Sequence, residues 1–297
     1  MTEGVDLSPR DDLRRAATYA LKSAAAFALM GIFVKAASER APNEVVVFFR
    51  NLVSMLTLLP ILLRGGLRET LATRRPWGHV LRTTFGLGSM YCFFFAISEL
   101  PLASAMLLTY STPLYVPFIA WLWLKERPDA IVFPCAMLGL VGIALIVKPG
   151  AGMFSGTGSL LGVAAGVFAA FAMVTVRSIS DTEPATRIVF YLAALGTLIS
   201  VVPLAWAWQT PDPRTFAFLV LSGVLATVGQ VNLTSAYTWA PAARVGPFSY
   251  TSVIFSAFLA WLIWGEGLDR WSMLGIAIVV ATCVLAGWRR REPLMEE

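Results

Sequence analysis

The stretch AISELPLASAMLLTYSTPLYVPFIAWLWLKERPD (residues 96–129) recurs later in the chain as AYTWAPAARVGPFSYTSVIFSAFLAWLIWGEGLD (residues 236–269). The two stretches align without a gap when Ala96 is paired with Ala236, and ten of the 34 positions are identical. We call this pairing, extended along the chain, the repeat alignment. The identities include proline, tyrosine, tryptophan, glutamate and aspartate, which a shared apolar composition would not produce. We interpret the recurrence as an internal duplication.

The composition of the whole chain is that of a membrane protein. Of the 297 residues, 57% are hydrophobic and only 14% are charged, and the mean hydropathy is +0.71. A helix that crosses the hydrocarbon core needs roughly 20 apolar residues. Ten such segments are present, at residues 16–37, 44–63, 78–98, 102–124, 130–147, 159–178, 186–208, 215–238, 245–264 and 271–288. The sequence therefore predicts an all-α integral membrane protein with ten transmembrane helices and no soluble domain.

The duplication divides these ten helices into two halves of five. Since five is odd, the second half must enter the membrane from the opposite side, which gives an inverted repeat. We expect an amino-terminal tail (1–15), a first repeat (16–148), a linker (149–158), a second repeat (159–288) and a carboxyl-terminal tail (289–297). Inverted repeats suit alternating access, so the sequence favours a transporter.

Lysine and arginine are distributed unequally over the two sides of this topology. Seventeen fall on one side and six on the other, and Arg74, Arg75 and Arg82 are counted with the seventeen. Cytoplasmic loops retain the excess of positive charge. Both termini are therefore expected in the cytoplasm, and the chain is expected in a bacterial inner membrane.

Four segments together resemble a known family. They are FFR (48–50), LPLASAMLLTYSTPLYVPFIAWLWLKERP (100–128), GLVGIALIV (139–147) and AWLIWGEGLD (260–269). Over residues 16–288 the chain resembles the ten-helix, EamA-type branch of the drug/metabolite transporter superfamily. The resemblance implies an inner-membrane carrier, often an exporter of amino acids or related metabolites, with a central cavity. The chain departs from the family pattern at Gly265 and Gly267, and no arginine in the seventh helix clearly matches Arg50.

The carboxylates narrow the class of carrier. All 18 acidic residues lie at helix ends, in loops or in tails, and none lies in mid-span. Proton-coupled antiporters of cationic drugs commonly need a membrane-embedded carboxylate. The sequence therefore argues against a cationic multidrug antiporter.

Two cations lie closest to the membrane interior, Lys35 and Arg50. Arg50 is seven residues past Asn43, or roughly 10 Å from the outer surface at 1.5 Å per residue. Glu39 or Glu44 is the expected partner. Both cations are assigned either to gating or substrate contact, or to a structural role at the outer interface.

Two acids are paired by the repeat, Glu126 and Glu266. They lie near Arg127 and Arg270, and we expect them to form helix-end ion pairs, with gating as the alternative role.

The segment TYSTPLYVP (109–117) has two prolines in one helix. Each proline removes a backbone donor, so Pro113 and Pro117 are expected to act as hinges and to free carbonyl groups. Polar side chains at such a break can line a cavity, although serine and threonine also bond back to their own helix. With the matching patch in the second half and the polar residues of the third and eighth helices, the candidate substrate-binding residues are Tyr91, Tyr110, Ser111, Thr112, Gln230, Asn232, Ser249 and Tyr250.

Three functions follow from these features. The first is export of small amino-acid-like metabolites, meaning amino acids or derived compounds such as opine-type metallophores. The second is import of a vitamin or nucleotide-like metabolite such as riboflavin, and the third is a membrane channel or sensor. An enzyme is disfavoured, because His79 is the only histidine and no cluster of catalytic groups is present. No cofactor, metal or nucleic acid is expected; the expected partners are the bilayer and a small molecule, with monomer and homodimer both open.

Overall fold

The computed structural model describes residues 12–64, 71–99, 107–126, 130–147, 156–264 and 269–288. These residues form helices joined by short turns, and no β-strand occurs among them. The helices are α1 (Leu13–Ser38), α2 (Asn43–Arg64), α4 (Pro76–Glu99), α6 (Thr112–Leu124), α7 (Val132–Val147), α8 (Thr157–Ile179), α9 (Ala185–Ala207), α10 (Pro213–Trp239), α11 (Ala242–Val245), the 3₁₀ helix η1 (Gly246–Tyr250), α12 (Thr251–Trp264) and α13 (Arg270–Trp288).

Several helices begin where the sequence supplies a cap or a proline. The carboxylate of Asp12 accepts a hydrogen bond from the Arg15 backbone N–H and so caps α1. Asp212 caps α10 in the same way, by accepting from the Thr215 N–H, and Pro213 occupies the first position of that helix. Such residues satisfy or remove the backbone donors that have no partner in a first helical turn.

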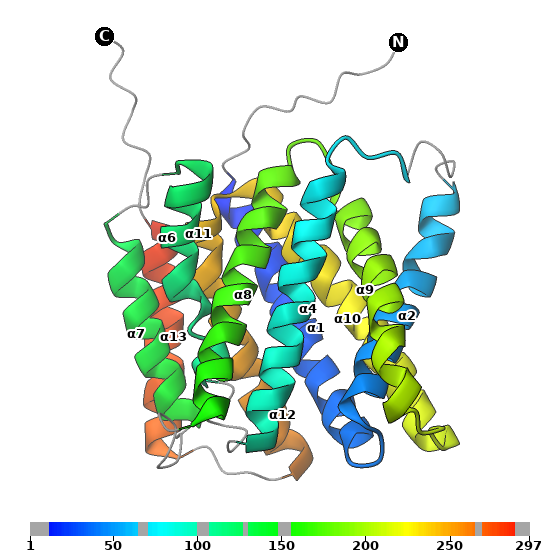
Figure 1. The fold of residues 1–297 in the computed structure, drawn as a ribbon. Helices are drawn as coiled ribbons and strands as arrows, with labels where there is room; N and C mark the ends of the chain where they lie inside the picture. Colours follow the sequence, from blue (N-terminus) through cyan, green and yellow to red (C-terminus); the bar gives the residue numbers. More distant parts are fainter. Residues whose placement is uncertain are drawn as a thin grey trace.

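The long helices run side by side and alternate in direction (Figure 1). Helix α1 begins and α13 ends on the same side of the bundle, which we call the amino-terminal face. Among the described residues, six helical segments are long and apolar enough to cross a membrane, and two shorter segments are also apolar. Large apolar side chains such as Leu160, Leu198 and Trp206 are about 70% exposed, as expected for a lipid-facing surface. The prediction of an all-helical membrane protein is confirmed.

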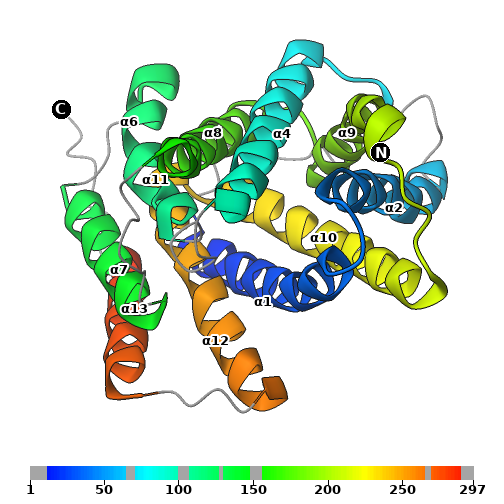
Figure 2. The same cartoon turned by 60° about the horizontal axis from the view of Figure 1, so that its bottom comes forward.

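Contacts between the two halves of the chain follow a regular pattern. Helix α1 packs on α10 and α12, while α8 packs on α4 and α6. Helix α2 packs on α9, and α7 packs on α13 (Figure 2). The helix ends agree with the repeat alignment, which pairs Glu99 at the end of α4 with Trp239 at the end of α10. It likewise pairs Leu124 at the end of α6 with Trp264 at the end of α12.

The contact between α7 and α13 depends on two glycines. A Cβ atom at Gly275 would lie 2.5 Å from the carbonyl oxygen of Gly142, and one at Gly142 would lie 2.9 Å from the carbonyl oxygen of Gly275. Both contacts are with backbone, which cannot move aside as a side chain can. Small residues allow membrane helices to approach at this distance.

We predict that Gly275→Ala destabilises the protein. The added methyl group must push α7 and α13 apart, and overpacking of this kind costs about 1–3 kcal/mol. The measurement is the melting temperature of the purified protein in detergent. Gly31→Ala is the matched control, since a Cβ at Gly31 meets nothing within 4 Å. Equal melting temperatures for the two variants would contradict the prediction.

Candidate functional site

The fourth membrane segment is interrupted near its middle. Residues 107–109 are helical, Tyr110 and Ser111 form a turn, and α6 starts at Thr112. Pro113 lies in the first turn of α6, where its missing N–H costs no hydrogen bond. The break therefore lies just before Pro113, whereas Pro117 lies inside the continuous helix.

Side chains satisfy the backbone carbonyls that this break frees. The hydroxyl of Thr112 donates to the carbonyl oxygen of Thr109 at 2.7 Å and lies 3.1 Å from that of Gly166 on α8. The hydroxyl of Ser111 donates to the carbonyl of Leu108. Gly166 is part of the motif GVAAG (162–166), and a Cβ there would lie 3.0 Å from the Leu108 oxygen. The motif thus allows the broken segment to lie directly on α8.

The ninth membrane segment is interrupted at the corresponding place. Here α11, the 3₁₀ helix η1 and α12 follow one another, with Pro247 in η1. The two interruptions touch, because the hydroxyl groups of Ser252 and Tyr110 are hydrogen-bonded to each other at 2.7 Å. The Ser249 hydroxyl is buried and has no hydrogen-bond partner in the described part of the chain.

The two repeat-related tyrosines do not face the same place. Tyr110 meets Ser252 at the contact between the interruptions, but Tyr250 is fully buried and donates to the carbonyl oxygen of Ala136 on α7 at 3.0 Å. The Tyr250 ring fills the space beside Gly139. In this structure Tyr250 is a core residue.

Two positive charges, one buried and one half-buried, lie between the two halves of the chain. Arg82 on α4 is 7% exposed, and its Nη2 donates to the amide oxygen of Gln230 on α10 at 3.1 Å. Arg50 on α2 places its Nη1 3.6 Å from the sulfur of Met90. Glu44 and Glu39, the expected partners of Arg50, form no ion pair with it, and no described carboxylate pairs with either arginine.

Arg82 was counted among the charges on one side of the membrane, but the structure places it inside the bundle. The residue lies within α4, and its guanidinium is buried against α10. It also lies inside the apolar segment 78–98, so its position in that segment was the signal that it belongs to the membrane interior.

The remaining candidates are placed as follows. The amide of Asn232 donates to the carbonyl of Val228 on its own helix. The hydroxyl of Tyr91 is buried without a hydrogen-bond partner among the described residues. Glu266 and the side chain of Lys35 lie outside the described residues.

Glu126 forms an ion pair with Arg177 of α8. The carboxylate accepts from the Arg177 Nε at 3.2 Å, and Arg177 also donates to the Tyr237 carbonyl at 3.1 Å. The contact joins the end of α6 to α8 and α10. Arg127, the expected partner, lies outside the described residues.

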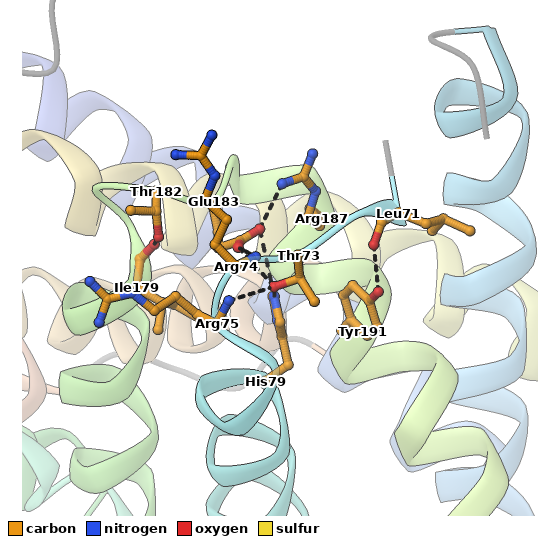
Figure 3. Close-up of polar contacts among 10 residues, drawn as sticks. All are labelled: Leu71, Thr73, Arg74, Arg75, His79, Ile179, Thr182, Glu183, Arg187 and Tyr191. Atoms are coloured by element: carbon orange, nitrogen blue, oxygen red, sulfur yellow. Dashed lines mark hydrogen bonds and ion pairs between the residues drawn. The ribbon is translucent and has the colours of Figure 1, made fainter. Parts of the chain in front are cut away.

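A second buried cluster joins the two halves at the amino-terminal face (Figure 3). Its centre is Glu183, which lies in the turn between α8 and α9 and has a fully buried side chain. Glu183 accepts hydrogen bonds from Arg187 at 2.7 Å, from the Thr73 hydroxyl at 2.8 Å and from the Arg74 N–H at 2.9 Å. His79 lies 3.7 Å away. The cluster therefore connects the segment before α4 with the turn before α9.

The surroundings of Glu183 stabilise its charged form. Burial by itself raises the pKa of the carboxyl group, but the donors from Arg187, Thr73 and Arg74 outweigh burial and hold the pKa below its ordinary value. Glu183 lies in a loop of the predicted topology, so its place at the centre of a buried cluster was not predicted. The available signal was its spacing of four residues from Arg187 at the start of a helix.

Comparison with known proteins identifies the family of this chain. The EamA-like transporter family matches residues 14–148 and 156–288. The chain belongs to the EamA-like transporter family. It is accordingly a membrane transporter that crosses the bilayer several times.

Individual relatives of this EamA-like transporter carry different substrates. It is 31% identical to the pseudopaline exporter CntI of Pseudomonas aeruginosa, over 92% of this chain and 96% of the relative. It is 26% identical to the riboflavin transporter of Vibrio cholerae, over 94% and 95%. It is 27% identical to the S-adenosylmethionine uptake transporter of Rickettsia bellii, over 79% and 80%.

A solved crystal structure shares the fold of this transporter. The TM-score is 0.78 at 16% sequence identity, and the match covers 91% of this chain and 96% of the other.

We predict that Glu183→Gln destabilises the protein by roughly 3 kcal/mol, the lower end of the cost of breaking a buried ion pair. The substitution removes the negative charge that Arg187 contacts. Thermal unfolding in detergent measures the effect, and Asp181→Asn, at an exposed position in the same turn, is the control.

The effect of this substitution depends on pH. Because folding lowers the pKa of Glu183, its stabilisation is present above the ordinary glutamate pKa of about 4.3 and is lost as pH falls through the lower folded-state value. The difference in melting temperature between wild type and Glu183→Gln should thus persist from pH 8 to about pH 5 and narrow only in stronger acid. A difference that narrows at neutral pH contradicts this assignment.

Proposed function

We propose that this EamA-like transporter exports a small amino-acid-derived metabolite, such as an opine-type metallophore, by alternating access across a bacterial inner membrane. The exporter relative supports the direction and the substrate class, since it aligns over nearly the whole of both chains. The observation that carries the mechanism is the pairing of helices between the halves.

That pairing supports an inverted repeat of two five-helix halves. In the repeat alignment, α1 corresponds to α8, α4 to α10 and α6 to α12. A two-fold axis that exchanges the halves converts the packing of α1 on α10 and α12 into the packing of α8 on α4 and α6. The same axis leaves the α2–α9 and α7–α13 pairs unchanged. In such a carrier, exchange of conformation between the halves exposes one site to each side in turn.

The polar contacts between the halves are where this exchange would act. The Tyr110–Ser252 bond joins the two interrupted segments, and the Glu183 cluster joins the halves at the amino-terminal face. For the substrate to pass to the amino-terminal face, the groups that contact Glu183 must separate, or the whole cluster must move as one body. We therefore propose that the Tyr110–Ser252 bond and the Glu183 cluster act as gates when the two halves exchange conformation.

Transport is tested by counterflow into liposomes that contain the purified protein. We expect liposomes loaded with an unlabelled opine to accumulate the labelled opine in a saturable manner. Riboflavin and S-adenosylmethionine are tested in parallel. Counterflow of riboflavin alone would favour the importer, non-saturable flux would favour a channel, and no flux of any of these compounds would refute the proposal. Release of the opine into the medium by expressing cells tests the direction.

Orientation is a separate prediction. We propose that the amino-terminal face is cytoplasmic, because most of the lysine and arginine residues fall on that side. Fusions of alkaline phosphatase or of green fluorescent protein to each terminus test it, since the first is active only outside the cytoplasm and the second fluoresces readily only inside. We expect both termini to give fluorescence and no phosphatase activity. Termini on opposite sides would exclude ten spans.

A further inference from the structure

The guanidinium of Arg82 has more donors than the described residues satisfy. Its Nη2 bonds to Gln230, but its Nε is buried and has no hydrogen-bond partner in the described part of the chain. A guanidinium has five N–H donors and no acceptor. The unused donors are therefore available to an acceptor other than the described residues.

Arg50 is in a similar position on the neighbouring helix. Its hydrogen-bond partner among the described residues is the sulfur of Met90, at 3.6 Å, and a thioether is a weak acceptor. Met90 lies eight residues after Arg82, so the two project from the same face of α4.

The absence of a side chain at Gly86 leaves room for the Arg82 guanidinium on the surface of α4. A Cβ at Gly86 would lie 2.5 Å from Arg82 Nη1, so the arginine occupies the space that a side chain at residue 86 would fill. The side chain of Arg82 thus lies along α4 toward Met90, and Arg50 approaches the same face of the helix from α2.

Both charges lie well inside the membrane. Arg82 is six residues past the start of α4, or about 9 Å, and Arg50 is seven residues past the start of α2, or about 10 Å. The two helices start at opposite faces of the bundle, so the arginines flank its middle from the two sides. Substrate sites of carriers with inverted repeats lie near the midplane of the bilayer, which is the level between these two arginines.

One buried and one half-buried positive charge of this kind require an anion. A charge inside the membrane is costly unless it is paired, and a second like charge increases the cost. Planar guanidinium groups match carboxylates through two parallel hydrogen bonds. We propose that Arg50, Arg82 and Gln230 form an anion site that binds carboxylate groups of the transported substrate. This assignment rests on the proposed transport of an amino-acid-derived compound.

The position of Gln230 makes the site sensitive to the arrangement of the halves. Gln230 lies on α10 in the second half, and the repeat alignment pairs it with Met90 of α4, so the two occupy equivalent positions. A carboxylate bound at Arg82 would thus lie between a residue of the first half and a residue of the second. The anion would link substrate binding to the movement of one half against the other.

The proposal is tested by ligand-dependent thermal stability of the detergent-purified protein. The probe is iminodiacetate, which has two carboxylates on one amine, and the control compound is the neutral diamide at matched ionic strength. We expect iminodiacetate to raise the melting temperature of the wild type and the diamide to have no effect. Arg50→Gln and Arg82→Gln should each abolish the shift, whereas Arg14→Gln, at an exposed position, should retain it.

Gly86→Ala provides a variant that keeps both arginines. Its methyl group displaces the flexible end of Arg82, so the protein should fold but lose most of the iminodiacetate shift. Gly88→Ala is the matched control, because a Cβ there makes only an ordinary contact with Phe168 at 3.5 Å. Size-exclusion profiles and the melting temperatures without ligand show which variants are folded.

Several outcomes would overturn the assignment. They are equal shifts with iminodiacetate and the diamide, retention of the shift in the folded Arg82→Gln variant, and stabilisation by inorganic phosphate or phosphatidylglycerol without stabilisation by iminodiacetate. The last result would assign the arginines to a phosphate or lipid headgroup. Opine counterflow with an unchanged half-saturating concentration in both arginine variants would leave the proposed function intact and remove this site. Binding of iminodiacetate without flux of any tested compound would support the anion site and refute the proposed transport function.

Discussion

A polypeptide inside a bilayer must satisfy its own hydrogen-bonding groups, because hydrocarbon offers no partners. Most of this chain does so by forming uninterrupted helices. The two interrupted segments do so differently: hydroxyl groups at Ser111, Thr112 and Ser252 bond to the carbonyls that a regular helix would have used. Gly166 allows one interruption to lie against α8, where a larger residue would separate the two backbones. The polar centre of the bundle depends on this local replacement of backbone bonds by side-chain bonds.

The same constraint explains why charge is concentrated between the halves. Glu126 pairs with an arginine of the other half, and Glu183 pairs with Arg187 while accepting from the backbone of the other half, so both charges are compensated within the protein. Arg50 and Arg82 have no such partner among the described residues. A fold that uses most of its ion pairs for structure, yet leaves one buried and one half-buried cation uncompensated among the described residues, is consistent with a carrier whose cargo supplies the missing charge.

The fold followed from the sequence to a large extent. The ten apolar segments and the repeat alignment correspond closely to the observed helices, because the length of a membrane helix is fixed by the thickness of the bilayer. The interruption near Pro113 was also expected, since a proline lacks the donor that a continuous helix needs. The partners of individual side chains could not be predicted in this way. Arg82 was counted with the charges on one side of the membrane because it lies near the start of its apolar segment, where one turn of helix decides whether a charge faces water or protein. Glu126 pairs with Arg177 of α8 through a contact that exists only after helices have packed.

The contact between Arg82 and Gly86 has an electrical consequence. The guanidinium rests against its own helix, so any displacement of α4 along the membrane normal moves the positive charge with it, even when the bond to Gln230 breaks. Moving one elementary charge through the full field is worth about 2.3 kcal/mol per 100 mV. Conformational exchange in this protein would therefore respond to the membrane potential, and a bound anion would reduce that response by neutralising the moving charge.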